Sequence, residues 1–242
     1  MVPPGLEIRD LSLRYAGESV FNDLHVTFSA GKFSVLLGPS GAGKTSLLRI
    51  IAGLEIPAGG YVRATDNAPL AGRIAYMAQQ DLLLPWANAL NNVMLGATLR
   101  GATKDADKAM KLLKRVGLCS RAQALPAQLS GGERQRVALA RTLYEDRPVV
   151  LMDEPFSALD AITRARIQDM AAELLAGRTV LLITHDPMEA CRLGHVLVVF
   201  SGSPAKLGTP ITVPGAPPRA LDDGQVLYTQ GELMRRLTGL HV

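Results

Sequence analysis

The stretch Gly38–Thr45, with the sequence GPSGAGKT, constrains the fold more than any other part of the chain. It fits the pattern G-x-x-x-x-G-K-[ST] at every position, after the apolar run Phe33–Leu37 and before a segment with helical spacing over Ser46–Ala52. Glycines without a Cβ let backbone N–H groups turn inward, and the following helix adds the positive end of its dipole. This order of strand, loop and helix predicts a phosphate-binding loop in an α/β fold.

The side chains that close the loop extend this prediction. Lys44 can reach the β- and γ-phosphate oxygens of a nucleotide, and the hydroxyl of Thr45 suits Mg²⁺. The alternative is a glycine turn with an exposed lysine, which the intact motif and its context argue against. The predicted nucleotide-binding residues here are Gly38, Pro39, Ser40, Gly41, Ala42, Gly43, Lys44, Thr45 and Ser46.

Two adjacent carboxylates follow a second apolar run, Val149–Met152. Strand alternation predicts that Asp153 and Glu154 point to opposite sides, so that Asp153 supports Mg²⁺ through a water while Glu154 faces an attacking water. Phosphoryl transfer depends on such positioning of a general base and of charge. An acidic pair after a strand can also be a loop start or a helix cap, but the phosphate loop favours the catalytic interpretation.

A second glycine signature precedes a helix predicted at Glu133–Glu145. Ser130, Gly131 and Gly132 at this helix start could bind an anion, or could be an N-cap with a flexible loop. A single nucleotide would hardly need two helix-start anion sites from the same chain. We therefore expect the second site to serve the nucleotide of a partner chain.

The pattern of apolar runs predicts a sheet with a helical insertion. Strands at Val149–Met152 and Thr179–Ile183 are apolar throughout and flank a helix at Ala161–Leu175, which is typical of a parallel sheet covered on both faces. The first thirty residues alternate like an antiparallel sheet. We expect one domain over residues 1–242, with a core of about 1–80 and 148–205, a helical subdomain of about 81–147, and a tail of about 206–242 that ends in a short helix near Glu232–Leu237.

Charge and composition exclude several classes of protein. The net charge of +4 comes from 26 basic and 22 acidic residues without basic blocks, and aromatic residues are 5%, so no nucleic-acid partner is expected. Cys119 and Cys191 lack metal-ligand spacing and are interpreted as reduced core residues. The N-terminus does not resemble a signal peptide, and nowhere do eighteen apolar residues run together, so we expect a soluble chain.

Up to about residue 205 the motifs together resemble the ATP-binding subunit of an ABC transporter. Ser157–Asp160 resembles the D-loop of that family, and Thr184-His185-Asp186 resembles its switch histidine. Tyr15 sits where the family keeps an aromatic ring that stacks on adenine. Gln79 resembles the Q-loop glutamine, although Ala78 replaces the usual aromatic residue and the adjacent Gln80 leaves the choice between the two open.

The resemblance implies a RecA-like P-loop NTPase with a parallel core, an antiparallel β subdomain and an inserted helical subdomain. ATP, with Mg²⁺ held by Thr45, Gln79 and Asp153, would lie in a head-to-tail dimer, between the phosphate loop of one copy and Ser130–Gly132 of the other. Glu154 would polarise the attacking water and His185 would contact the γ-phosphate. Gln79 would link the metal to the membrane partner, and Asp160 would lie at the dimer seam.

The segments Leu82–Trp86 and Asn91–Val93 resemble the corresponding part of the cassettes in importers of nitrate, sulfonates, taurine and pyrimidine precursors of thiamine. In such cassettes the segment helps line a groove for a short helix of the membrane subunit, although these residues could instead be core of the helical insertion. The implied partners are permease subunits and, indirectly, a periplasmic or extracytoplasmic solute-binding protein. The implied location is the cytoplasmic face of the inner (cell) membrane. An exporter-type cassette and a non-transport ATPase acting on another partner stay open as alternatives.

Overall fold

The computed structural model describes residues 2–239, which form two compact units. The first unit contains residues 2–74, 148–153 and 175–239, and the second contains residues 75–147 and 154–174. The predicted helical stretch 81–147 therefore lies in the second unit. Residues 154–174, assigned above to the sheet core, belong to the second unit, where Glu173 pairs with Arg115.

The N-terminal strands of the first unit form an antiparallel sheet in the order β2-β1-β4. The alternating pattern of the first thirty residues predicts β1 and β2, whereas β4 was not predicted from the sequence. Leu6 of the central strand pairs with Phe28 on one side and Ala64 on the other, and all three side chains are buried. The strands are β1 (Leu6–Tyr15), β2 (Glu18–Phe28) and β4 (Gly59–Ala64).

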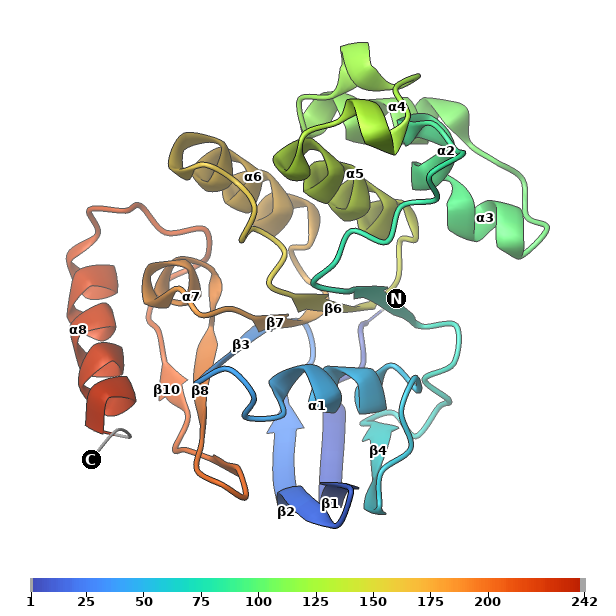
Figure 1. The fold of residues 1–242 in the computed structure, drawn as a ribbon. Coiled ribbons are helices and arrows are strands. Elements are labelled where there is room, and N and C mark those ends of the chain that lie inside the picture. Colours follow the sequence, from blue (N-terminus) through green and yellow to red (C-terminus); the bar gives the residue numbers. More distant parts are fainter. Residues whose placement is uncertain (1, 240–242) are drawn as a thin grey trace. The chain divides into compact units, whose positions relative to one another are not determined.

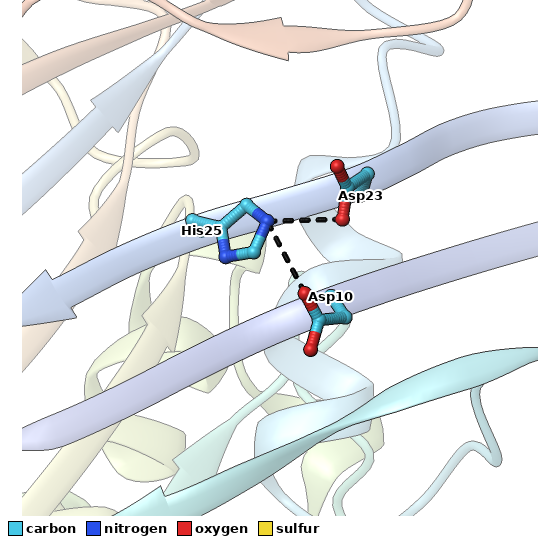
Figure 2. A group of neighbouring side chains, drawn as sticks. All are labelled: Asp10, Asp23 and His25. Atoms are coloured by element: carbon cyan, nitrogen blue, oxygen red, sulfur yellow. Dashed lines mark hydrogen bonds and ion pairs between the residues drawn. The ribbon is translucent and has the colours of Figure 1, made fainter.

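The ladder between β1 and β2 is irregular where two aspartates adopt left-handed backbone angles. Asp10 and Asp23 each have φ of 52°, and the β1–β2 register shifts between Ile8 and Leu11. The Nε2 atom of His25 lies 2.9 Å from Oδ1 of Asp23 and 3.4 Å from Oδ1 of Asp10 (Figure 2). All three side chains are exposed, so these polar contacts add little to stability.

A second sheet of the first unit has the order β10-β8-β3-β7-β6, with β9 paired to β8. Strands β3, β6, β7 and β8 run parallel, and the first three are buried along their whole length, as predicted from their continuous apolar sequence. The carboxyl ends of β3, β6 and β7 therefore meet at one edge. The bounds are β3 (Phe33–Leu37), β6 (Val149–Asp153), β7 (Thr179–Ile183), β8 (Val196–Ser201), β9 (Lys206–Leu207) and β10 (Ile211–Thr212).

Three helices complete the first unit: α1 (Lys44–Ile51), α7 (Pro187–Leu193) and α8 (Gly224–Thr238). The terminal helix predicted near Glu232–Leu237 is longer than expected, because Asp223 caps its start. The Asp223 carboxylate accepts hydrogen bonds from the backbone N–H groups of Gln225 at 2.8 Å and Val226 at 3.4 Å. Helix α8 packs beside α7 (Figure 1).

The second unit is mainly helical and begins within strand β5 (Ile74–Met77). Its central helix α5 contacts α2 and α4. Of the two cysteines predicted to be in the core, Cys191 in the first unit is buried, but the prediction is wrong for Cys119, which is exposed in a short 3-10 turn. The helices are α2 (Ala89–Val93), α3 (Leu95–Leu99), α4 (Ala106–Arg115), α5 (Gly131–Tyr144) and α6 (Ala161–Leu174), with 3-10 turns at Cys119–Arg121 and Pro126–Gln128.

Within residues 2–239, none of the helices combines the length and the apolar character needed to cross a membrane.

Candidate functional site

The phosphate loop lies where the sequence predicts it, between β3 and α1 in the first unit. Gly38, Gly41 and Gly43 have φ of 148°, 80° and 89°, a region of backbone conformation that side chains disfavour. A Cβ on Gly38 would lie 2.1 Å from the carbonyl oxygen of Phe200, and one on Gly43 would lie 2.5 Å from a methyl group of Val20. Glycine is therefore required here by both backbone conformation and space.

Lys44 begins helix α1 and is 8% exposed. Its ammonium group turns back over the loop and donates hydrogen bonds to the carbonyl oxygens of Gly38 at 2.9 Å and Pro39 at 2.7 Å. This places the charge inside the curve of the loop. A phosphate group bound by the loop would meet that cation directly.

Thr45 and Asp153 come together at the same sheet edge. The Thr45 hydroxyl donates a hydrogen bond of 2.7 Å to Oδ2 of Asp153, which ends β6 and is 1% exposed. Hydroxyl and carboxylate oxygens form a hard donor set of the kind that Mg²⁺ prefers. These two predicted metal ligands therefore fit the cation.

Tyr15 ends β1 and lines a pocket of about 350 Å³ together with the first half of the phosphate loop. Its hydroxyl lies 3.3 Å from Oγ of Ser46 and donates to the carboxylate of Glu55, whose hydrogen bond raises the pKa of the phenol. The ring is about half exposed. The pocket is lined by Tyr15, Glu18, Ser19, Val20, Pro39, Ser40, Gly41, Ala42, Gly202 and Ser203.

His185 emerges at the carboxyl end of β7, beside the strands that carry the phosphate loop and Asp153. The side chain is exposed, whereas the preceding Thr184 is buried. The Thr184 hydroxyl accepts a hydrogen bond of 3.0 Å from the backbone N–H of Asp186. Asp186 then caps α7, accepting from the backbone N–H of Met188 at 2.9 Å.

Glu154 and Gln79 contact each other in the second unit. The Gln79 amide nitrogen lies 3.3 Å from Oε2 of Glu154 and donates to it, while Gln135 and Ser157 donate to the Glu154 carbonyl oxygen at 3.4 and 3.0 Å. Strand alternation does not set the directions of the two carboxylates, contrary to the prediction, because β6 ends at Asp153 and Glu154 has a left-handed φ of 49°. A left-handed non-glycine residue of this kind is often held in place at a functional site.

The second glycine signature begins α5 with a reciprocal cap. The Ser130 side chain accepts a hydrogen bond of 3.2 Å from the Glu133 backbone N–H, and the Glu133 carboxylate accepts one of 2.8 Å from the Ser130 N–H. The Ser130 N–H in particular lowers the pKa of Glu133. The helix starts at Gly131, two residues before the predicted start, so both glycines lie in its first turn.

Asp160 lies at the start of α6, where its Oδ1 accepts a hydrogen bond of 3.0 Å from the Thr163 backbone N–H. This hydrogen bond lowers the pKa of Asp160, and the residue is exposed. The predicted position at a dimer seam stays a prediction, and the exposure of Asp160 is compatible with it.

Comparison with known proteins identifies the family of this chain. The sequence profile of the ABC transporter family matches residues 21–157, more than half of the chain. The chain belongs to the ABC transporter family. It is an ATP-binding protein of that family, an ATPase that hydrolyses ATP for transport, and its fold is the cassette fold.

Relatives of this ABC transporter ATP-binding protein cover nearly all of it. An uncharacterized ABC transporter ATP-binding protein of Haemophilus influenzae is 41% identical over 239 residues, covering 97% of this chain and 99% of the relative. The aliphatic sulfonates import ATP-binding protein SsuB 1 of Rhodococcus jostii is 42% identical over 95% and 92% of the two chains. SsuB of Escherichia coli K12 is 41% identical over 96% and 90%.

Among solved structures, this ABC transporter ATP-binding protein resembles the cassette MJ0796. A dimeric post-hydrolysis structure of MJ0796 bound to ADP and Pi matches with a TM-score of 0.77 and 30% identity, covering 87% of this chain and 99% of that one. Binding of ATP or ADP is therefore a property of the cassette to which this chain belongs.

Sequence reasoning missed three residues beside the predicted site of this ABC transporter protein. Glu55 contacts Tyr15 from the turn after α1, Gln135 donates to the Glu154 carbonyl, and Val20 lies against Gly43. Only Gln135 carries a signal, because it is a polar residue among the mostly apolar buried positions of α5. Glu55 and Val20 reach the site through tertiary contacts, which no local sequence pattern predicts.

Proposed function

We propose that two copies of this chain bind ATP head to tail and energise solute import through separate permease subunits. Two glycine-rich helix starts in one chain, each of a kind that can bind an anion, support this arrangement. The phosphate loop lies in the first unit and Ser130–Gly132 in the second. The dimeric MJ0796 cassette, bound to ADP and Pi, is a structural precedent for such an assembly. Each nucleotide would then be held by Lys44 of one copy and the Ser130 loop of the other.

Thr45 and Asp153 would hold Mg²⁺ beside the β- and γ-phosphates, with the Gln79 side-chain oxygen as a third ligand. When bound, the cation neutralises charge on the transferring phosphoryl group. The hydrogen bond from the Thr45 hydroxyl to Asp153 sets the two oxygens close together before the metal arrives. This contact carries the proposal, because a phosphate loop next to a buried carboxylate and a hydroxyl is built for a metal–nucleotide complex.

Glu154 is the proposed general base, following Asp153 directly in the chain. Its carboxylate accepts a hydrogen bond from Gln79, which would keep it oriented until a water takes that place. His185 would contact the γ-phosphate from the end of β7. Tyr15, which lines the pocket at the phosphate loop, would stack on the adenine ring, and Asp160 would lie at the seam between the two copies.

The relatives that import aliphatic sulfonates suggest the direction of transport and the class of solute. We propose a small organic or inorganic anion, a sulfonate in the first place, with a thiamine-pyrimidine precursor as the alternative. The solute itself would be selected by the permease and by an extracytoplasmic binding protein. The ATP-binding chain would sit at the cytoplasmic face of the cell membrane, held there by the permease.

The exposed apolar residues of the second unit are the proposed contact with the permease. Trp86 is 76% exposed and Leu82 is 60% exposed, so neither belongs to the core of the helical unit. The loop that carries them is fixed by Asn92, a buried residue on α2 that bonds to the backbone of Leu84 and Ala87. A rigid loop that presents an indole ring suits an anchor residue in an interface.

Turnover by a Glu154→Gln variant tests the proposed base. We expect ATP hydrolysis to fall by about 10²–10⁴-fold while ATP binding is retained, since glutamine keeps the shape but cannot take a proton. Glu173→Gln, which changes an exposed carboxylate of the same unit, is the matched control and should hydrolyse ATP normally. Turnover near wild type in Glu154→Gln would show that the base lies elsewhere.

Uptake of a labelled alkanesulfonate into vesicles holding the complex would test import.

A further inference from the structure

Arg219, in the C-terminal tail, is a charged residue that is only 4% exposed. Its guanidinium donates three hydrogen bonds to the tail's own backbone, to the carbonyl oxygens of Pro214 at 2.6 Å, Gly215 at 2.7 Å and Val213 at 2.8 Å. Charge-assisted hydrogen bonds of this kind are roughly twice as strong as neutral ones. Arg219 therefore fixes the loop of the tail around itself.

The same guanidinium satisfies the C-terminal end of α7. Its Nη1 atom donates to the carbonyl oxygens of Cys191 at 2.9 Å, Gly194 at 2.9 Å and Arg192 at 3.4 Å. The last carbonyl groups of a helix need partners from outside the helix, and a left-handed glycine often arranges them. Gly194 has φ of −77° instead, so Arg219 takes that role.

The backbone adds a second link between the tail and α7. The Arg219 N–H donates to the Arg192 carbonyl oxygen at 3.1 Å, and Nε of Arg192 donates to the Arg219 carbonyl oxygen at 2.9 Å. Helix α8 then packs beside α7 (Figure 1). The tail thus holds α7 by its C-terminal end and along its side.

At its other end, α7 begins two residues after His185. Asp186 caps the helix, and the seven residues Pro187–Leu193 span about 10 Å, so α7 is a short rigid link. His185 is fixed on one side by β7 and on the other by this capped helix. A shift of α7 at its Arg219 end would therefore be transmitted to the histidine.

We infer that Arg219 is a positioning residue for ATP hydrolysis, and that through α7 it sets the placement of the His185 side chain. This inference rests on the role of His185 given under the proposed function. It assigns a purpose to the tail after residue 205, which contains none of the motifs of the proposed ATP site. The tail would stabilise the position of the residue that contacts the γ-phosphate. The phosphate loop and the Tyr15 pocket contain no residue of α7, so the tail should affect hydrolysis more than ATP binding.

Steady-state ATP hydrolysis by Arg219→Ala in the full chain tests the inference. We expect kcat to fall about tenfold with KM for ATP within twofold of wild type, because small misplacements of a positioned group lower the chemical step. The kcat of Arg219→Lys should lie between those of wild type and Arg219→Ala, since the lysine ammonium group supplies three hydrogen-bond donors. Arg236→Ala, which removes an exposed tail arginine on α8, should leave kcat unchanged. A wild-type kcat in Arg219→Ala would overturn the inference.

A double-mutant cycle with His185→Ala separates positioning from general destabilisation. In the His185→Ala background, Arg219→Ala should cause no further loss of kcat, with rates normalised to the fraction of chain that binds nucleotide. If the losses of kcat from the two single substitutions multiply in the double variant, the inference is overturned, while the role of His185 is unaffected. Unchanged turnover in His185→Ala alone would instead refute the proposed function at this residue, and the inference with it. If Arg219→Ala does not fold, the cycle is run with Arg219→Lys.

Discussion

The Thr45 hydroxyl and the Asp153 carboxylate, 108 residues apart in sequence, lie 2.7 Å from each other at the carboxyl edge of the parallel sheet. One belongs to the first turn of α1 and the other ends β6. Parallel pairing brings them together, because β3 and β6 both flank β7 and end at the same edge. The pair gives the phosphate loop a buried anionic neighbour that can share a cation with the nucleotide.

A Thr45→Val substitution tests that pair. We expect ATP turnover at limiting Mg²⁺ to fall at least about 10–100-fold and to recover partly at high Mg²⁺. Valine removes a proposed oxygen ligand, and even groups that only orient a metal ligand typically contribute on that scale. Loss of a hydrogen bond to a buried carboxylate should also lower the free energy of unfolding by about 1.5–3 kcal/mol. A Mg²⁺ titration of ATP hydrolysis measures the first effect and thermal unfolding the second. Thr45→Ser, which keeps the hydroxyl, should behave like wild type, and a Thr45→Val variant with normal Mg²⁺ dependence would contradict the metal assignment.

The choice between Gln79 and Gln80 can be tested by a matched pair of alanine substitutions. Gln79 donates to the Glu154 carboxylate, and hydrogen bonds to charged groups contribute about 1.5–3 kcal/mol, so Gln79→Ala should lower kcat at least about tenfold. Gln80→Ala should keep kcat within about twofold, as expected of a surface substitution. Steady-state ATPase assays of both variants decide the matter. The reverse order of effects would assign the role to Gln80.

Asn92 should determine the stability of the loop that presents Trp86. The buried amide accepts from the Leu84 N–H at 2.8 Å and donates to the carbonyl oxygens of Ala87 at 2.8 Å and Leu84 at 3.2 Å. Asn92→Ala removes these hydrogen bonds inside the protein and should destabilise the chain by about 1–3 kcal/mol. The exposed neighbour Asn91, changed to alanine, should stay within about 0.5 kcal/mol of wild type.

Urea unfolding followed by the fluorescence of Trp86, the one tryptophan of the chain, reports directly on that loop. Equal unfolding midpoints for Asn92→Ala and Asn91→Ala would show that Asn92 does not stabilise the loop that carries Trp86.

The cap at Ser130 predicts a pH dependence of stability through Glu133. Its pKa lies below the ordinary value of 4.5 in the folded chain, mainly because the Ser130 backbone N–H bonds to the charged form. The unfolded chain therefore takes up a proton first, so the contribution is complete above about pH 4.5 and is lost as pH falls through the lowered folded pKa. The difference in unfolding free energy between wild type and Glu133→Gln should shrink over this range. A difference that stays constant between about pH 3 and pH 6 would contradict the prediction.

The correct and incorrect predictions share a physical reason. The phosphate loop, the parallel strands and the cap at Ser130 depend on residues within a few positions of each other, and the structure has them where the sequence places them. Strand alternation does not determine the orientation of Glu154, because the backbone turns left-handed after Asp153. The lack of metal-ligand spacing predicts Cys119 as a core residue, but its 3-10 turn leaves it exposed.

By itself the sequence determined the fold class, the phosphate loop and the family, because each depends on local patterns of glycine, apolar residues and helix caps. Only the tertiary structure decided which distant side chains meet. It joined Thr45 to Asp153, Gln79 to Glu154, and Arg219 to the end of α7. Such contacts depend on strand order and on the path of loops, which the free energy of packing the whole chain selects.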